Sequence, residues 1–318
     1  MSNNHPQKTI KAAQLKWLGN MPLSTVYEDY YFSLKNSLEE IRYVHLAQNQ
    51  LPQRWLTQAI DKNSSPFTIV ETGFGTGLNF LIAWQAWEKL TEPKQAFSFI
   101  SIEKYPFTKE DLARSLKNWP ELGVLSQQLI QQYPYLVQGS HLLSFNDGKV
   151  KLQLIFDDVN RSLETYSFSA DCWFLESFLP SKNSSMWTDS LFNLMANTSH
   201  SQTTFSSFST VNSVHKDLAN VGFEVQKATG FGGKRDMIFG KFKQLNTTTF
   251  FQKTLSNWTS PEPAQQLKGK GKNQKNITYY DAIIIGAGLA GITTAAAFAE
   301  KGLKVALIDQ RDRPVSGA

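Results

Sequence analysis

The feature that most constrains this chain is a glycine-rich turn between a strand-like and a helix-like segment. Residues 67–71 form a short run rich in apolar and β-branched side chains, and the turn Glu71-Thr72-Gly73-Phe74-Gly75-Thr76-Gly77 follows directly. Residues 78–90 then place large apolar side chains at helical spacing. A strand, a glycine turn and a helix in this order predict a parallel α/β sheet whose backbone approaches a nucleotide closely.

The rest of the chain up to Lys243 continues the alternation of strands and helices. We expect strands at 97–103, 150–156, 172–175 and 203–209, a helix at 109–115, and a closing hairpin within 223–240. Residues 12–52 lack this alternation and are interpreted as an N-terminal extension, in which Ser37 followed by Glu40 predicts the start of a helix. The pattern indicates an open, mostly parallel Rossmann-like sheet with helices on both faces.

The composition changes after Lys243. Residues 244–278 are rich in threonine, serine, proline, glycine and lysine, as expected for a linker. A fresh strand at 282–285 precedes a second glycine turn with Gly286, Gly288 and Gly291, and a later strand ends at Asp309. We therefore predict one domain over 1–243, a linker over 244–278, and the beginning of a second nucleotide-binding domain over 279–318.

Composition narrows the class of protein. The 318 residues include 41% hydrophobic and 19% charged residues, which is ordinary for a globular protein, and the net charge of +5 is compatible with a polyanionic partner. The single cysteine, Cys172, excludes an intrachain disulfide and a thiolate-based metal site, so no metal is expected. We also expect no signal peptide, no membrane span and a cytoplasmic location.

Two acidic positions follow strands where such a fold binds its nucleotide. Glu103 ends the second expected strand, and a carboxylate there can accept both hydroxyls of a ribose. Asp158 follows the third expected strand and suits either the adenine amino group or the cap of the next helix.

The first glycine turn has the form E-x-G-x-G-x-G, which resembles the cofactor loop of class I S-adenosylmethionine (SAM) methyltransferases. That resemblance implies that Glu71 organises the loop, and that the backbone through Gly73, Gly75 and Gly77 to Asn79 faces the cofactor. Glu176 follows the fourth expected strand, at 172–175, beside the place of the transferred methyl group. A carboxylate there can accept a proton from an amine that is to be methylated.

Several segments together resemble the bifunctional enzymes of tRNA 5-methylaminomethyl-2-thiouridine biosynthesis (MnmC). The resemblance is carried by residues 31–33, 38–44, 71–80, 102–104, 173–187 and 230–237. It implies SAM-dependent methylation of the 5-aminomethyl nitrogen of a wobble uridine, with tRNA as partner. It also implies that the second glycine turn and Asp309 begin the FAD-dependent oxidase domain that removes a carboxymethyl group before methylation.

The residues themselves also suggest substrate-binding positions. Tyr31 belongs to an aromatic cluster that can stack on a flipped base or form core, and Lys182 is a further candidate. Lys234 and Arg235 can grip an RNA phosphate or belong to an ordinary charged hairpin. The chain also departs from the family pattern Asp-Gly-Phe-x-Pro, because residues 176–180 read Glu-Ser-Phe-Leu-Pro.

These departures leave two alternatives to the tRNA methyltransferase. One is a methyltransferase with another substrate, and the other is a non-catalytic domain that binds only tRNA or cofactor. A flavin oxidoreductase is rejected for this chain, because a strand, a helix and a second strand cannot enclose FAD. We therefore expect 280–318 not to hold FAD stably, which a stoichiometric flavin absorbance of the purified chain would contradict.

Overall fold

The computed structural model describes residues 9–32, 36–57, 65–91, 94–178, 180–209, 211–233, 236–243, 281–285, 294–295, 298 and 303–308. The chain divides into two compact units, Met1–Asn257 and Trp258–Ala318. The expected linker over 244–278 lies outside the described residues.

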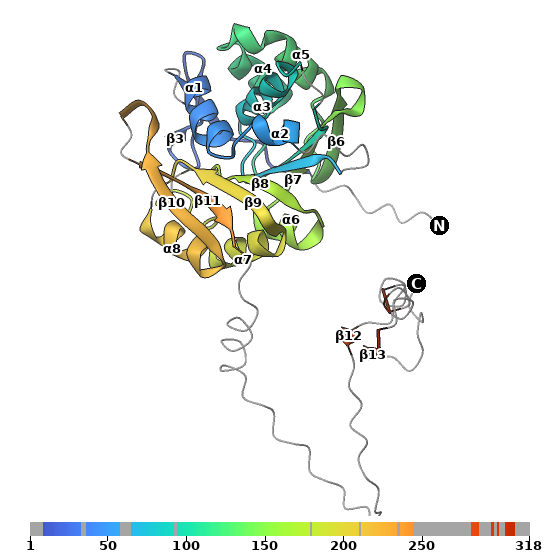
Figure 1. Ribbon diagram of the computed structural model, residues 1–318. Helices are drawn as coiled ribbons and strands as arrows, with labels where there is room; N and C mark the ends of the chain where they lie inside the picture. The colour runs from blue at the N-terminus through green and yellow to red at the C-terminus, as the bar shows by residue number, and fades with distance from the viewer. Residues whose placement is uncertain are drawn as a thin grey trace, which may run out of the picture. The chain divides into compact units, whose positions relative to one another are not determined.

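The first unit is built on a large mixed sheet (Figure 1). Its eight strands lie in the order β10-β11-β9-β8-β4-β5-β7-β6. The five strands from β9 to β7 in this order are parallel to one another. Strand β6 at one edge and strands β11 and β10 at the other add antiparallel pairs. The strands are β4 (Phe67–Glu71), β5 (Phe97–Glu103), β6 (Gly139–Phe145), β7 (Val150–Phe156), β8 (Ala170–Phe174), β9 (Ser199–Ser207), β10 (Phe223–Thr229) and β11 (Asp236–Phe242). The predicted Rossmann-like sheet is confirmed.

Helices cover both faces of this sheet. One face carries α3 (Leu78–Glu88), α4 (Lys109–Leu116) and α5 (Gly123–Gln132), and the other carries α6 (Val159–Thr165), α7 (Asp189–Asn197) and α8 (Asn212–Asn220). The short helical turn η2 (Pro120–Leu122) connects α4 to α5. Two others lie between strands: η3 (Asn146–Gly148) between β6 and β7, and η4 (Phe231–Gly233) between β10 and β11.

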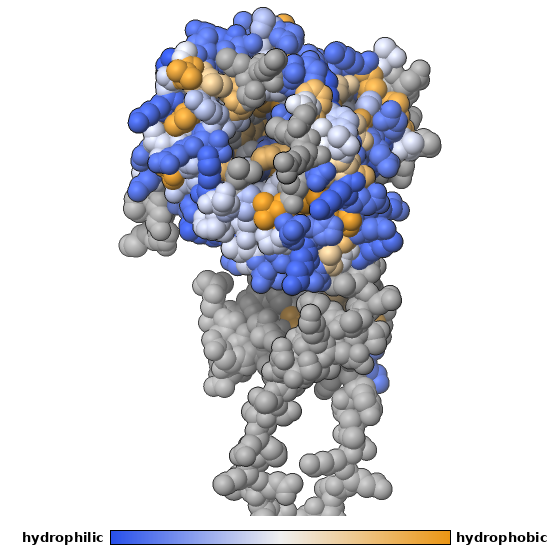
Figure 2. Space-filling view, turned by 90° about the vertical axis from the view of Figure 1, so that its left-hand side faces the viewer, coloured by the Kyte–Doolittle hydropathy of each residue, from blue (hydrophilic) through white to orange (hydrophobic). Residues whose placement is uncertain are grey.

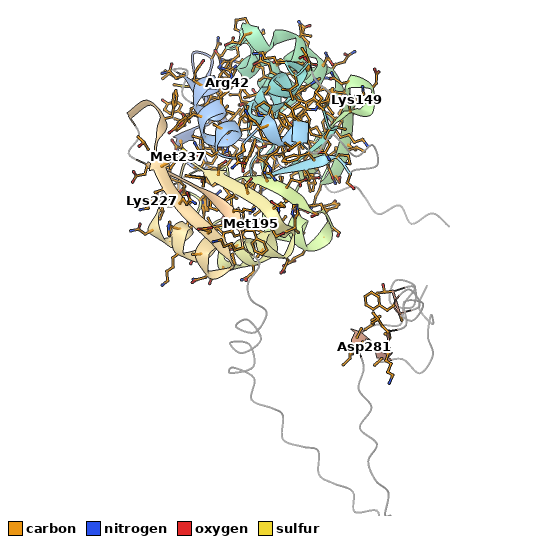
Figure 3. The ribbon with its side chains drawn as sticks, in the orientation of Figure 1. Arg42, Lys149, Met195, Lys227, Met237 and Asp281 are labelled. Carbon is orange, nitrogen blue, oxygen red and sulfur yellow. The ribbon has the colours of Figure 1, made fainter. Side chains whose placement is uncertain are left out.

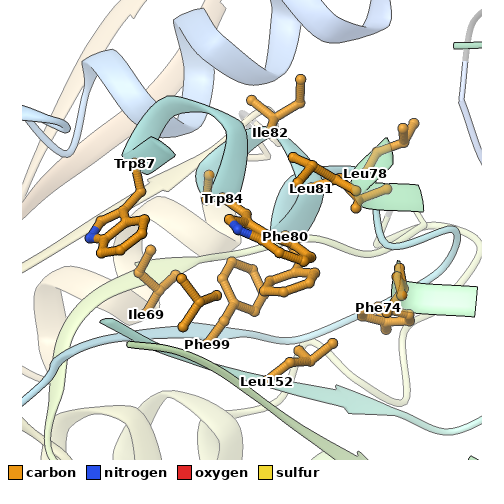
Figure 4. Packing of buried hydrophobic residues seen from close by; sticks show 14 of the residues in the cluster. Ile69, Phe74, Leu78, Phe80, Leu81, Ile82, Trp84, Trp87, Phe99 and Leu152 are labelled. Atoms are coloured by element: carbon orange, nitrogen blue, oxygen red, sulfur yellow. The ribbon is translucent and has the colours of Figure 1, made fainter. Parts of the chain in front are cut away.

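The central strands contribute side chains to two separate hydrophobic cores, because successive side chains of a strand point to opposite faces of the sheet. In β4, Ile69 joins the core under α3, whereas Val70 joins the core over α7. Figure 4 shows the first core, where Trp84 and Phe80 of α3 lie against Phe99 of β5. Large aromatic side chains bury more apolar area than any others, so this packing holds α3 firmly behind the glycine turn.

The N-terminal extension has more regular structure than its sequence suggested. Strands β1 (Leu15–Leu18), β2 (Met21–Ser24) and β3 (Asp29–Tyr30) form a small antiparallel sheet. The expected helix begins at Ser37 as α1 (Ser37–Ile41), with Asn36 rather than Ser37 as its N-cap. It continues as the π-helix η1 (Arg42–Ala47), and α2 (Gln53–Thr57) follows. Strands of two to four residues have too few positions for an alternation to be visible in the sequence.

The second unit contains the parallel strands β12 (Ala282–Ile285) and β13 (Val305–Ile308). This pair matches the expected strand before the second glycine turn and the strand before Asp309. The turn residues Gly286, Gly288 and Gly291, and Asp309 itself, lie outside the described residues.

The surface of the first unit is mixed in character. On the face shown in Figure 2, hydrophilic residues predominate and hydrophobic residues form separate patches. Figure 3 shows the same contrast by residue: Lys227 lies on the outer strand β10, whereas Met195 lies on α7, where it is fully buried. None of the described helices has the length and apolar character needed to cross a membrane.

Candidate active site

A cavity of about 790 Å³ opens where the direction of strand succession reverses. Strand β4 leads to β5 on one side and lies against β8 on the other, so the segments after β4 and β8 diverge at the carboxyl edge. Open α/β sheets bind ligands at this kind of reversal, and the volume is within the range of cofactor pockets. The cavity walls come from the glycine turn, the segment after β8, the N-terminal sheet and α1 with η1.

The glycine turn lies directly against the segment after β8. A Cβ added to Gly73 would stand 3.0 Å from the carbonyl oxygen of Glu176. Gly75 has a φ of +50° and lies against the Tyr31 ring, and both Gly73 and Gly75 line the cavity. Gly77 is not part of the wall, but its φ of +72° and its approach to the Phe74 ring also require a glycine. The turn therefore depends on its glycines for close approach to the segment after β8 and to neighbouring rings, and its approach to a cofactor stays a prediction.

Glu71 lies beneath the turn and is buried. Its Oε1 accepts a hydrogen bond from Asn79 Nδ2 at 2.7 Å, and its Oε2 accepts one from Ser101 Oγ at 2.6 Å. Burial raises the pKa of Glu71 to about 8, although both hydrogen bonds favour the charged form. Asn79 lines the cavity, so Glu71 orients a side chain of the wall from behind.

Glu103 ends β5 and lines the cavity. Its Oε2 accepts a hydrogen bond from Gly75 N at 2.9 Å, and its Oε1 accepts one from Tyr105 N at 2.8 Å. Burial raises the pKa of Glu103, and these backbone N–H groups act in the opposite direction. The backbone N–H groups of Lys104 and Phe74 also favour the charged form, so Glu103 is held by a cluster of backbone donors at the cavity wall.

Asp158 caps α6. Its Oδ1 accepts a hydrogen bond from Asn160 N at 3.1 Å, while Lys104 Nζ lies 3.1 Å from Oδ2. The helix-cap role is thus observed, and Asp157 and Asp158 both line the cavity. A contact of Asp158 with adenine stays a prediction.

Glu176 lies two residues beyond β8 and lines the same cavity. Thr72 locks its backbone in place: Thr72 Oγ1 donates to the Glu176 carbonyl at 2.8 Å and accepts from Glu176 N at 3.1 Å. The Glu176 side chain is 25% exposed, and its Oε1 lies 2.5 Å from Nε2 of His45. The structure therefore brings the glycine turn and this carboxylate to one side of the sheet, with open space between them.

The sequence reasoning did not identify His45, Asn49 or Ser206. His45 Nδ1 lies 2.9 Å from Ser206 Oγ, and Asn49 Nδ2 donates to the same oxygen at 2.8 Å. His45 follows the family-like residues 38–44 directly, and that adjacency was the available signal. Their meeting depends on the packing of η1 on β9, which no local pattern encodes.

Aromatic side chains form the outer wall of the cavity. The rings of Tyr27 and Phe178 stack at 4.5 Å, and Tyr31 meets Phe178 edge-on at 5.1 Å. Tyr31 also meets Phe107 edge-on, and burial raises the pKa of its hydroxyl above the ordinary range. Tyr31 is thus both packed and part of the cavity wall, and stacking on a base stays a prediction.

The other expected substrate residues lie outside the cavity wall or outside the described residues. Lys182 Nζ donates to the Glu28 carbonyl at 2.9 Å and pairs with Asp29 at 3.2 Å, so it ties the segment after β8 to the N-terminal sheet. Lys234 and Arg235 lie outside the described residues. Among the residues that the structure describes, no group of three metal-ligating side chains is present.

Comparisons with known proteins agree with this architecture. A family described as S-adenosyl-L-methionine-dependent methyltransferase matches residues 120–243, and one described as FAD dependent oxidoreductase matches residues 281–318. The crystal structure of MNMC2 from Aquifex aeolicus superposes with a TM-score of 0.54 at 20% identity, covering 83% of this chain and 82% of that one. At this identity the likeness shows the fold alone.

Two relatives of higher identity match this chain along nearly its whole length. The tRNA 5-methylaminomethyl-2-thiouridine biosynthesis bifunctional protein MnmC of Marinomonas sp. (strain MWYL1) is 40% identical over 97% of this chain and 44% of its own length. The protein of the same name from Methylobacillus flagellatus is 42% identical over 94% of this chain and 41% of its own length. The chain spans less than half the length of these curated relatives.

The glycine turn, the carboxylates around it and these similarities agree on one assignment. The chain matches MnmC proteins along nearly its whole length, and it contains one segment similar to SAM-dependent methyltransferases and one similar to FAD-dependent oxidoreductases.

Proposed function

We propose that this chain methylates the 5-aminomethyl nitrogen of 5-aminomethyl-2-thiouridine at the wobble position of a tRNA, using SAM. The observation that carries the proposal is the placement of Glu176 in the same cavity as the glycine turn and Glu103. A relative's name supplies the tRNA substrate class, and the cavity supports the methyl-transfer chemistry. A tRNA substrate also implies a cytoplasmic location.

The residues around the cavity suit SAM. Gly73 and Gly75 present backbone without side chains to the cavity, and Glu103 places its carboxylate in the same wall, where it could accept hydrogen bonds from ribose hydroxyls. Asn79, oriented by Glu71, lines the same cavity. When bound, SAM supplies an electrophilic methyl group on its sulfonium.

Glu176 handles the proton of the substrate amine. An alkylamine is mostly protonated near neutral pH, and only its neutral form has a lone pair for attack. The Glu176 carboxylate would accept this proton, which would leave the amine nitrogen with a lone pair to receive the methyl group that bound SAM supplies. Holding the two reactants in line supplies much of the remaining acceleration.

The test begins with calorimetry of SAM binding, followed by mass spectrometry of nucleosides from hypomodified tRNA incubated with the protein and SAM. We expect binding and one added methyl group on the aminomethyl nucleoside. Binding without methylation of tRNA would contradict the substrate and favour another acceptor, whereas loss of both would favour a non-catalytic domain.

Substitution of Glu176 tests its role as proton acceptor. Glu176→Gln removes the basic oxygen and is expected to lower kcat by roughly 10²- to 10⁴-fold, with SAM affinity unchanged. Glu176→Asp keeps a carboxylate and should retain more activity than Glu176→Gln. Equal activity of the wild type and Glu176→Gln would show that the carboxylate accepts no proton.

A further inference from the structure

We propose that His45 is a positioning residue that holds the Glu176 carboxylate in the orientation needed to accept the amine proton. The inference rests on the function proposed above and extends it to a side chain outside the family-like motifs. His45 lies in the π-helix η1 and is 1% exposed, with its ring stacked on Phe174 at 4.7 Å. Single π-helical turns are frequent at functional sites because they redirect one side chain out of the helical pattern.

The hydrogen-bond partners of the imidazole define which nitrogen carries the proton. Asn49 Nδ2 can only donate, so Ser206 Oγ accepts from it at 2.8 Å. The Ser206 hydroxyl proton is then free to point to His45 Nδ1, 2.9 Å away, and we assign Nδ1 as the acceptor of this bond. A neutral imidazole with a bare Nδ1 carries its proton on Nε2, and that N–H points to Glu176 Oε1.

The chain also fixes Asn49 from both sides. Asn49 Nδ2 donates to the His45 carbonyl at 2.9 Å, and its Oδ1 accepts a hydrogen bond from Thr204 Oγ1 at 2.6 Å. These contacts set the orientation of the amide, so its NH2 group faces Ser206. The network therefore has a defined direction, from Asn49 through Ser206 and His45 to Glu176.

This arrangement explains how a glutamate serves where the family pattern has an aspartate. The side chain of Glu176 is one methylene longer and has one more rotatable bond, which would leave its carboxylate less well oriented. The His45 N–H binds Oε1, and within the described part of the chain Oε2 has no hydrogen-bond partner. Oε2 is thus available to the substrate amine.

The first test compares His45→Phe and His45→Gln in the full 318-residue chain. Phenylalanine keeps a ring on Phe174 but has no donor, and should lower kcat for tRNA methylation by about 10- to 100-fold while SAM affinity is unchanged. Glutamine restores an N–H donor that cannot titrate, and should recover most of the loss. His215→Gln on α8 is the matched control and should behave as wild type. Wild-type kcat in His45→Phe would overturn the proposal.

A double variant tests whether His45 acts through Glu176. Glu176→Asp retracts the carboxylate from His45, so adding His45→Phe to Glu176→Asp should cost little beyond Glu176→Asp alone. Additive losses in the double variant would contradict a role through Glu176.

A spectroscopic readout separates this inference from the proposed substrate. Nitrogen NMR of the histidine side chains should show His45 with a protonated Nε2 and a bare Nδ1, assigned by the loss of its signals in His45→Gln. Its Nε2 signal should shift in Glu176→Gln. If the tautomer is as expected but no tRNA is methylated, the substrate proposal fails and the His45 contact stands. A proton on Nδ1, or on both nitrogens at neutral pH, would refute the inference.

Discussion

At the scale of single residues, three carboxylates of the site differ in their surroundings and hence in their proposed tasks. Glu71 is fully enclosed beneath the glycine turn, Glu103 is clamped by backbone N–H groups, and Glu176 faces open cavity. Burial penalises charge, while backbone donors and solvent favour it. The same functional group can therefore support a loop, offer lone pairs to a ribose, or accept a proton.

Glu71 should make the stability of the free protein depend on pH. Its pKa is raised from an ordinary value of 4.5 to about 8, so between these values the folded state holds a proton that the unfolded state has lost. Stability therefore falls as pH rises through this range, by up to about 1.4 kcal/mol per pH unit. Urea unfolding of Glu71→Gln between pH 5 and 8 should show a flatter dependence than wild type.

The control for this prediction is Glu164→Gln. Glu164 is an exposed residue of α6, and its replacement should leave the pH dependence as in wild type. An unchanged slope in Glu71→Gln would show that Glu71 is ionised in the folded protein.

Glu103 should matter chiefly for SAM affinity. Glu103→Gln removes the charge and one acceptor oxygen, so it weakens both the clamp on Gly75 and the proposed ribose contacts. Hydrogen bonds to charged groups contribute about 1.5–3 kcal/mol, which corresponds to roughly a 10- to 100-fold rise in the Kd for SAM. Calorimetry measures this directly, and a Kd equal to wild type would exclude Glu103 from the ribose site.

At the scale of elements, the site depends on how the glycine turn joins β4 to α3. Helix α3 is held by buried aromatic side chains, and the turn must reverse within a few residues while passing against the segment after β8. Two of its glycines have positive φ, a conformation that costs residues with a Cβ roughly 1–2 kcal/mol. The geometry of the turn is thus determined by backbone sterics more than by side-chain contacts.

Gly77→Ala should destabilise the protein. A Cβ at Gly77 would stand 2.7 Å from the Phe74 ring, in addition to the cost of its φ of +72°. We expect a loss of about 1–3 kcal/mol in the free energy of unfolding, measured by urea denaturation.

Gly123→Ala provides the matched control. Gly123 begins α5, and a Cβ there meets no atom within 4 Å. Alanine at this position should be neutral or stabilise the protein by up to about 1 kcal/mol. Equal effects of the two substitutions would show that the turn tolerates a side chain.

At the scale of the whole molecule, the two compact units are distinct. The first contains the complete eight-stranded sheet and the entire cavity, while the second contributes the parallel pair β12 and β13. We therefore propose that residues 1–243 are a self-sufficient methyltransferase domain. The oxidoreductase similarity belongs to residues 281–318.

A polypeptide of residues 1–243 should fold and bind SAM as the longer chain does. All described residues that line the cavity lie before Lys243. Deletion of residues 244–318 therefore removes none of them. Thermal unfolding and calorimetry should give the same Tm and Kd for both polypeptides. A lower Tm or weaker binding of the shorter one would show that later residues support the first unit.

The sequence by itself determined the Rossmann-like sheet, the glycine turn, the positions of Glu71 and Glu103 at the ends of strands, and that of Glu176 just after a strand. These features are local, because hydrophobic periodicity and glycine placement are written in neighbouring residues. The family resemblance added the methyltransferase and the start of an oxidoreductase.

Only the tertiary structure decided which distant side chains meet. The contact of His45 with Glu176 spans 131 positions, and that of His45 with Ser206 spans 161. Such pairs arise from the packing of η1 against the sheet. Burial of apolar surface drives this packing without a preferred direction, so the sequence carries no periodic signal for a single polar contact. The cap role of Asp158 and the tie from Lys182 to Asp29 were decided in the same way, by what the fold places within hydrogen-bonding distance.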